Sequence, residues 1–372
     1  MLLKRKVIGF YLLTFILLLV FLYSAFSLFR AGFSYHMVSA AQQGWSDGLT
    51  RGDRLLGHAL SRNTSGHEIF YDRRIAVSTN TYGMRVEPSN RRDDGLGRKV
   101  LFLGDSFTFG AAVEAKHTFP QLVASDKGLS VFNAAVPSYG VAHLVLQAET
   151  LIPSVKPDMV VVQYSPWLIQ RSMSPFMETR FSEIPQPYIS ADGGLHVAAP
   201  LSPNRLAGIP IEQHITSSPN LAERVFFFFR YALPAILKTD YDKLCIFMAR
   251  VMGRMKAPAS DPFEVTRYAY ERISRVAGSH GSQVVILVLG SNQPFDIPFP
   301  FFPAGVYVVD AQSALIGALN QRTPEEYVRR YWHWSGNPPV LLDYHPNRVA
   351  HRVIADALIP SLQEIVRQNG SY

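Results

Sequence analysis

The side chains that could do chemistry stand in two short stretches, far apart in the chain. Gly104, Asp105 and Ser106 directly follow an apolar run. Asp343 and His345 stand two residues apart near the C-terminus, before a helix-like apolar pattern. A Ser hydroxyl attacks only when a base takes its proton, and the base needs a carboxylate to fix its tautomer. Ser106, His345 and Asp343 are therefore the predicted catalytic set.

Each stretch alone has a simpler interpretation. A Gly at the end of a buried strand leaves the next hydroxyl at the carboxyl edge of the sheet, where Ser106 could also serve as a helix cap. Taken alone, His345 would be a helix-start residue beside Pro346. The two stretches together favour the catalytic interpretation. His351 lies on the following helix and is interpreted as structural.

The two stretches resemble the first and last sequence blocks of the SGNH/GDSL hydrolases. The matching residues are Gly104-Asp-Ser-Phe-Thr-Phe-Gly110 and Asp343-Tyr-His-Pro-Asn347, and the likeness runs from about Lys99 to the C-terminus. Upstream, residues 80–85 and 53–57 resemble the lead-in of membrane-anchored bacterial members. The resemblance implies a three-layer α/β/α, flavodoxin-like domain with a parallel sheet, esterase-type or acyl-transfer chemistry and no cofactor.

The resemblance also implies an oxyanion hole, which needs donors aimed at the oxygen that becomes negative. Family members use the amide of the nucleophile and the amide of a Gly in the second block. Here the second block is 133–140, and Ser138 stands at the position of that Gly, two residues before Gly140. The amides of Ser106, Ser138 and Gly140 are the predicted donors, because a backbone amide survives a Gly-to-Ser change when the backbone angles suit Ser. Asn133 and Asp105 are candidate pocket residues.

The chain departs from the family in two further places. The third block of the family supplies an Asn side chain to the oxyanion hole, but here Trp167 stands near that position. An indole N–H is also a donor, and Ser165, Gln163 and Asn292 are the alternatives. The family often places its acid three residues before the His, where this chain has Leu342; the two-residue spacing of Asp343 also occurs among relatives.

Composition and charge limit the classes of partner that the chain is expected to bind. The 372 residues carry a formal net charge of +7, with 48% hydrophobic and 17% charged residues. Lys and Arg form no block of five, so no nucleic-acid partner is expected. The basic excess favours acidic lipid headgroups or an anionic glycan. Cys245 is the single cysteine, which excludes an internal disulfide, and no cluster in the sequence has metal-ligand spacing.

The N-terminus predicts a membrane anchor. Residues 7–29 form an uncharged apolar run of about the length that a helix needs to cross the lipid bilayer. Lys4, Arg5 and Lys6 precede the run and orient its start toward the cytoplasm. The remainder then lies on the periplasmic or extracellular side of the cytoplasmic membrane. A cleaved signal peptide is the alternative, for which residues 24–27 offer a poor cleavage site.

Strand and helix patterns alternate after residue 99, as in a parallel sheet. The predicted organisation is an anchor over 1–30, a lead-in with little regular periodicity over 31–98, and an SGNH hydrolase-like domain over 99–372 with an insertion at about 165–262. Predicted strands are 100–103, 130–134, 159–163, 283–289 and 306–309, and predicted helices are 119–125, 141–152, 263–277 and 348–367.

Three segments keep alternative interpretations. Residues 225–237 read as a core or cap helix, or as a segment that docks on the bilayer or on a partner. Residues 295–303 form an apolar loop that could line the pocket or face lipid. His333, between two Trp residues, fits buried packing better than stacking on a sugar.

The sequence thus predicts an ester hydrolase that removes acyl groups from an O-acylated carbohydrate or a similar ester. The first alternative is transfer of the acyl group to a cell-surface polysaccharide by the same Ser106. The second is a non-catalytic subunit of this fold that binds a glycan or scaffolds a membrane complex; the missing third-block Asn favours it, and the intact Ser106 and His345 oppose it.

Overall fold

Apolar runs in the chain become the buried strands of a parallel sheet, as the sequence predicts. Strands covered on both faces have continuous apolar sequences, and 100–103 are fully buried. The strands are β7 (Arg98–Leu103), β8 (Leu129–Asn133), β9 (Met159–Tyr164), β14 (Gln283–Val288) and β15 (Tyr307–Asp310). The computed structural model describes residues 11–19, 21–25, 43–45, 48–70, 73–88, 97–125, 129–178, 183–197, 244, 248, 251–252, 258–290 and 302–369.

The order of the parallel strands reverses beside β7. The parallel part of the sheet runs β8-β7-β9-β14-β15, so the chain begins in the middle, adds β8 on one side and then continues on the other. The direction of growth reverses between β7 and β9. Open α/β sheets bind their ligands at such a reversal, outside the carboxyl ends of the strands. Ser106 follows β7 and therefore lies at the carboxyl end of the strand where the order reverses.

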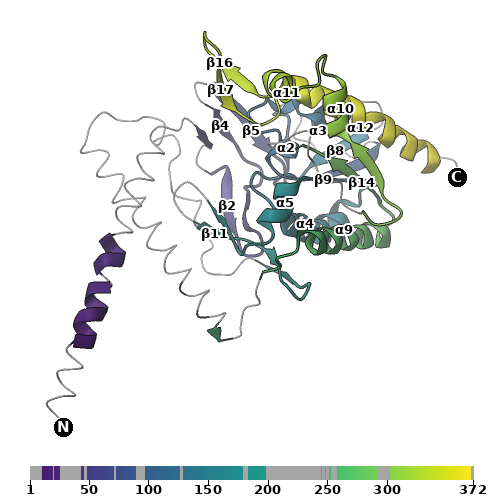
Figure 1. The fold of residues 1–372 in the computed structure, drawn as a ribbon. Helices are drawn as coiled ribbons and strands as arrows, with labels where there is room; N and C mark the ends of the chain where they lie inside the picture. Colours follow the sequence, from purple (N-terminus) through teal and green to yellow (C-terminus); the bar gives the residue numbers. More distant parts are fainter. Residues whose placement is uncertain are drawn as a thin grey trace.

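Helices cover both faces of the sheet (Figure 1) and bury one hydrophobic cluster on each side. In α12, Ile354, Leu358, Leu362 and Ile365 recur at helical spacing and face the core, which fixes how the helix packs. One face carries α4 (Val141–Val155), α5 (Pro166–Arg171) and α9 (Pro262–Ser279); the other carries α3 (Phe119–Ala124), α10 (Ala311–Gly317), α11 (Pro324–Tyr331) and α12 (Arg348–Asn369). All four predicted helices are present.

The lead-in is more regular than the sequence predicts. Four of its strands join the central sheet, which reaches nine strands in the order β1-β4-β5-β6-β8-β7-β9-β14-β15, and β2 and β3 form a separate antiparallel pair. Leu49, Leu60, Val77 and Met84 enter the same core as the helices on one face. The sequence did not reveal these strands, because short antiparallel strands broken by turns leave too little periodicity to detect. They are β1 (Gln43–Trp45), β2 (Thr50–Asp53), β3 (Gly57–Leu60), β4 (Ser65–Phe70), β5 (Arg73–Thr79) and β6 (Arg85–Val86).

The N-terminal residues 11–19 and 21–25 are helical and exposed. Among the described residues, no helix has both the length and the apolar character that a membrane span requires. Residues 225–237, Cys245, Asn292 and residues 295–301 of the predicted loop 295–303 lie outside the described residues. After α5, the described part of the insertion forms two small antiparallel pairs: β10 (Phe176–Glu178) with β11 (Glu183–Pro185), and β12 (Tyr188–Ile189) with β13 (Leu195–His196).

Candidate active site

The turn after β7 holds Ser106 at the first position of the short helix α2 (Ser106–Phe109). Gly104 is required there, because a Cβ on it would lie 2.3 Å from Thr108 Oγ1 and 2.6 Å from Gln163 Oε1. The carboxylate of Asp105 caps the helix by accepting from the Phe107 amide at 3.0 Å. Ser106 is 7% exposed, and its hydroxyl makes no hydrogen bond to any described residue. The hydroxyl is thus held in place by the backbone and left without a competing partner.

The hairpin of β16 (His333–Ser335) and β17 (Val340–Asp343) presents the second predicted stretch. The Nδ1 of His345 donates to the Asp343 carboxylate, which also accepts from the His345 amide at 2.6 Å. This bond fixes the tautomer and leaves Nε2 as the acceptor. Nε2 has no hydrogen-bond partner among the described residues. The structure thus joins Asp343 and His345 as a pair, across the two-residue spacing found in the sequence.

The electrostatic surroundings favour the protonated form of His345. Burial by itself lowers the pKa of His345, but the hydrogen bond and the charge of Asp343, followed by the charges of Glu68 and Asp105, outweigh burial and raise the pKa above 6.5. Glu68 comes from β4 and is buried, which raises its own pKa. A raised pKa means that an imidazolium formed during a reaction is stabilised where it forms.

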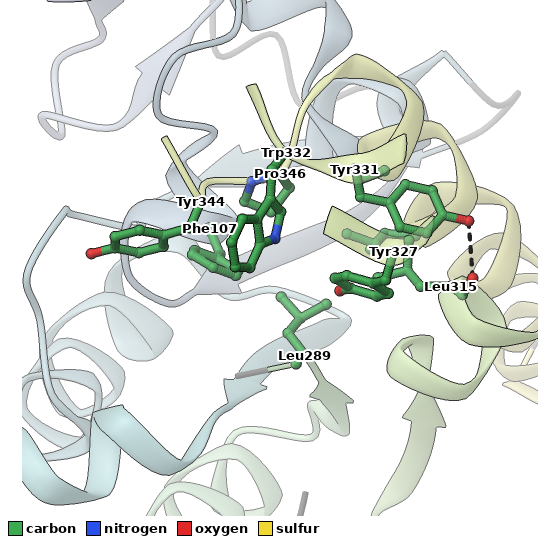
Figure 2. A pocket seen from close by; sticks show the side chains of 11 residues that line it. Phe107, Leu289, Leu315, Tyr327, Tyr331, Trp332, Tyr344 and Pro346 are labelled. Carbon is green, nitrogen blue, oxygen red and sulfur yellow. Dashed lines mark hydrogen bonds between the residues drawn. The ribbon is translucent and has the colours of Figure 1, made fainter. Parts of the chain in front are cut away.

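Aromatic rings bring the two remote stretches together. Phe107, the residue after Ser106, packs edge-on against His345 with ring centroids 5.5 Å apart. Tyr344 stacks on the same imidazole at 5.1 Å and 17°. Figure 2 shows Phe107, Tyr344, Trp332 and Pro346 side by side around a small cavity. The imidazole therefore lies against the turn that carries the hydroxyl.

The cavity in Figure 2 is too small to hold a substrate. Its volume is about 10 Å³, which is room for one water molecule or a methyl group. Its walls come from Phe107, Leu289 and the rings of α11, where the Tyr331 hydroxyl donates to the Leu315 carbonyl at 2.9 Å. Phe107 and Tyr344, the two rings that contact His345, are also part of this wall.

A buried network around Asp105 occupies the place of the missing third block. Asp105 is fully buried and forms an ion pair with Arg171, Nη1 to Oδ2 at 2.8 Å. Trp167 Nε1 donates to the same oxygen at 2.7 Å, and Gln163 Nε2 donates to the other oxygen at 2.9 Å. Ser165 accepts from Gln163 and donates to the Leu289 carbonyl. The side-chain donors proposed from the sequence at 163, 165 and 167 are thus already engaged within the protein.

The loop after β8 supplies a backbone donor instead. Its Val136 amide bonds the Gly104 carbonyl at 3.2 Å, which holds the loop against the end of β7. Ser138 has φ 71°, a left-handed conformation that favours Gly, and its amide donates to no acceptor among the described residues. The Gly140 amide, in contrast, donates to His143 Nδ1 at 3.1 Å. Of the two predicted loop donors, the structure leaves Ser138 available and commits Gly140.

Two further predicted residues have structural contacts. Asn133, a candidate pocket residue, donates through Nδ2 to the Thr108 carbonyl at 3.2 Å and accepts from the Ala135 amide. It therefore ties α2 to the loop after β8. His351 is fully buried and accepts from the Phe119 amide at 3.2 Å, and burial lowers its pKa to about 3. This agrees with the structural role predicted for His351.

His333 is packed inside the protein. It is 7% exposed and lies edge-on to Phe70 at 5.1 Å. Burial, followed by the charge of Arg73, lowers its pKa to about 4. The packing interpretation of His333 is confirmed. No group of three or more His, Cys, Asp or Glu within the described ranges could hold a metal ion.

Sequence reasoning missed Arg171, His58 and Glu68. Arg171 follows Trp167 by four residues on α5, so one face of that short helix carries both donors to Asp105. That four-residue spacing could have identified Arg171 from the sequence. Glu68 and His58 come from the lead-in strands β4 and β3, whose place in the fold the sequence pattern did not reveal.

Comparison with protein-family models finds no match, and comparison with curated proteins finds none either. Solved structures do resemble the chain. The crystal structure of TesA is 12% identical with TM-score 0.33, over 72% of this chain and 99% of that one. LAE5, an α/β hydrolase enzyme from the metagenome of Lake Arreo, Spain, is 12% identical with TM-score 0.36, over 72% and 96%. A member of the lipolytic G-D-S-L family from Veillonella parvula is 10% identical with TM-score 0.34, over 72% and 99%. At this level of similarity, the chemistry must be judged from the chain's own side chains.

Proposed function

We propose that this chain is a serine ester hydrolase in which Ser106, His345 and Asp343 form the catalytic set. The observation that carries the proposal is the Asp343–His345 pair packed, through Phe107, against the turn that presents the Ser106 hydroxyl. A paired imidazole with its second nitrogen free, beside a hydroxyl without a partner, is the arrangement that activates a serine nucleophile.

The residues have distinct parts in the reaction. His345 Nε2 accepts the proton of the Ser106 hydroxyl as Oγ attacks the ester carbonyl carbon. The tetrahedral intermediate collapses, the bond to the alcohol breaks, and His345 returns the proton to the leaving alcohol. Water then attacks the acyl-enzyme with His345 again as base, which releases the acid and restores Ser106. Asp343 stabilises the imidazolium at both stages.

The oxyanion is held by backbone amides in this proposal. The amide of Ser106 is at the start of α2 and has no intrahelical acceptor, and the amide of Ser138 donates to no described group. Two such donors aimed at the developing charge are the usual minimum for acyl transfer. The Asp105 network lies where the family's third-block Asn is expected. Its donors cannot bind the oxyanion as that Asn does, because they already donate to the Asp105 carboxylate.

We further propose an O-acylated carbohydrate or a similar exported ester as the substrate, outside the cytoplasmic membrane. The apolar run at 7–29 after Lys4, Arg5 and Lys6 supports this location. The net charge of +7 on the chain favours its attraction to an acidic cell envelope. Protease added to intact spheroplasts of cells that carry the chain should digest the catalytic domain. Protection of the domain from the protease would reject this location.

The test of the chemistry uses the full chain in detergent with p-nitrophenyl acetate and a fluorophosphonate probe. We expect the wild type to hydrolyse the ester and to be labelled at Ser106, because only an activated Ser reacts with the probe. Ser106→Ala should abolish both, and His345→Gln should lower kcat by about 10³-fold or more. His67→Gln, at an exposed site on β4, is the matched control. A folded wild type that neither turns over the ester nor takes the label would exclude the enzyme.

Acyl transfer is the second candidate, and one observation favours it. Ser106 is only 7% exposed, so an acyl-enzyme there is partly shielded from water. Mass analysis of the products with and without an added sugar acceptor separates the two reactions. Acylated sugar formed in excess of free acid would assign the chain to transfer. A non-catalytic glycan-binding or scaffolding subunit is the remaining alternative, and it predicts that the probe fails to label Ser106.

A further inference from the structure

The peptide bond between Pro137 and Ser138 is held from behind by a histidine of the lead-in. His58 Nε2 lies 3.1 Å from the Pro137 carbonyl oxygen, which belongs to the same peptide as the Ser138 amide. We infer that His58 is a positioning residue, which holds this peptide so that the Ser138 N–H points at the oxyanion. The inference rests on the proposed function for its catalytic consequence and on the hydrogen bond itself for its structural part.

His58 can only donate in this contact. A carbonyl oxygen accepts, so the proton of the imidazole is on Nε2, and Nδ1 is buried without a hydrogen-bond partner. His58 is 4% exposed, and burial lowers its pKa, which keeps the ring neutral near pH 7. The ring packs edge-on to Tyr139 at 5.0 Å, and the Tyr139 hydroxyl donates to the His58 carbonyl at 2.7 Å. Strand β3 and the loop are thus joined at two points.

Ser138 needs such support because its backbone is strained. Ser138 has φ 71°, which is unfavourable for a residue other than Gly, so we expect the loop to relax when the contact with His58 is removed. The Tyr139–Gly140 peptide is also held: Arg171 Nη1 donates to its Tyr139 carbonyl at 3.0 Å, and its Gly140 amide donates to His143. His58 is the contact that acts on the peptide carrying the Ser138 N–H.

The bond also polarises the donor. A hydrogen bond to a peptide oxygen strengthens the hydrogen bond that the N–H of the same peptide can make, in the direction of the oxyanion. A donor fixed before the reaction costs no reorganisation when charge develops. His58 therefore contributes to the transition state without touching the substrate.

The experiment compares His58→Gln with His58→Leu in the full chain. The amide nitrogen of Gln reaches about as far as Nε2 and can donate to the Pro137 carbonyl, whereas Leu only fills space. We expect His58→Leu to lower kcat for p-nitrophenyl acetate about 10- to 100-fold with KM changed less than about twofold. His58→Gln should stay within about threefold of wild type. Leu60→Ala removes a buried side chain of the same strand and is the control for lost stability alone.

Hydrogen exchange of residues 134–140 gives a readout that does not depend on turnover. We expect faster exchange in this loop for His58→Leu than for wild type and His58→Gln, at matched global stability. Equal loop exchange in all three chains, or an equal loss of kcat in the Gln and Leu variants, would overturn the role of His58. If the wild type is inactive but the loop exchanges faster in His58→Leu, the ester chemistry would be rejected and the positioning role of His58 would stand.

Discussion

The two sides of Ser106, which are the base side and the oxyanion side of the proposed mechanism, are built in different ways. On the base side, Asp343 and His345 lie two residues apart and bond directly, with rings packed around them. On the oxyanion side, the Asp105 network and the loop of residues 134–140 depend on contacts between residues 62, 66 and 79 positions apart. One side is a local motif, and the other is assembled only when the whole domain folds.

The comparison indicates that a short sequence motif can specify the base side, whereas the oxyanion side depends on the fold of the whole domain. The base side keeps the residue types of its family resemblance, because a proton transfer needs particular side chains. The oxyanion side needs only backbone N–H groups in the right place, and many different side chains can hold a backbone there. Under the proposed mechanism, Trp167 near the position of the family's third-block Asn is therefore compatible with activity.

The largest effect that tests the comparison is expected from Asp343→Asn on the base side. Loss of the carboxylate leaves the tautomer of His345 unfixed, and we expect kcat to fall about 10²–10⁴-fold. Asp343 raises the pKa of His345, and the base acts only when neutral, so kcat/KM rises with pH through that pKa. The variant should therefore move the acidic limb of the pH–rate profile to lower pH. An unchanged limb would assign it to another group.

Arg171→Met tests the oxyanion side and should have a smaller effect. It leaves the fully buried Asp105 carboxylate without its cation, which should destabilise the fold by about 1–3 kcal/mol and lower kcat about tenfold. Adding Asp105→Asn should recover stability measured by urea unfolding, because no buried charge then remains unpaired. Arg275→Met, at an exposed position of α9, is the control. A double variant less stable than Arg171→Met would contradict the ion-pair account.

The sequence predicted the parallel sheet, four of the helices that cover it and the closeness of Asp343 to His345. Continuous apolar runs and helical periodicity are local properties, and so is the spacing of Asp343 and His345. The lead-in strands escaped prediction because strands as short as β6 carry no period, and their pairing Arg85↔Asn133 is non-local. The sequence also did not reveal that the Trp167 and Gly140 donors are occupied, because their acceptors, Asp105 and His143, are set by the folded structure.

The pH dependence of folding stability should distinguish His345, which is paired with Asp343, from the buried His351. Burial lowers the pKa of His351 to about 3, so below pH 6.5 the unfolded chain binds a proton that the folded chain does not. Its contribution to stability is present above 6.5 and is lost as the pH falls. His345 has the opposite sign: its pKa is raised, so its contribution is present below 6.5 and is lost as the pH rises through the folded value.

We expect His351→Asn to flatten the dependence of unfolding free energy on pH between about 6 and 4, by roughly 1.4 kcal/mol per pH unit. The Asn oxygen can still accept from the Phe119 amide, which limits other losses. Urea unfolding at several pH values measures the slope, with His67→Asn as the exposed control. Parallel pH profiles for His351→Asn and wild type would show that His351 is not a source of acid sensitivity.

The smallest effect is expected from Ser138→Gly, and it decides which atom of Ser138 acts. Gly relieves the strain of φ 71° but loses more entropy on folding, so stability should rise by only about 0–1 kcal/mol. If the backbone N–H binds the oxyanion, Ser138→Gly and Ser138→Ala both retain kcat within about twofold, since neither removes the amide. A tenfold loss in both would assign the donor to the hydroxyl instead. In that event the oxyanion side would depend on a particular side chain, as the base side does, and the contrast between the two sides would disappear.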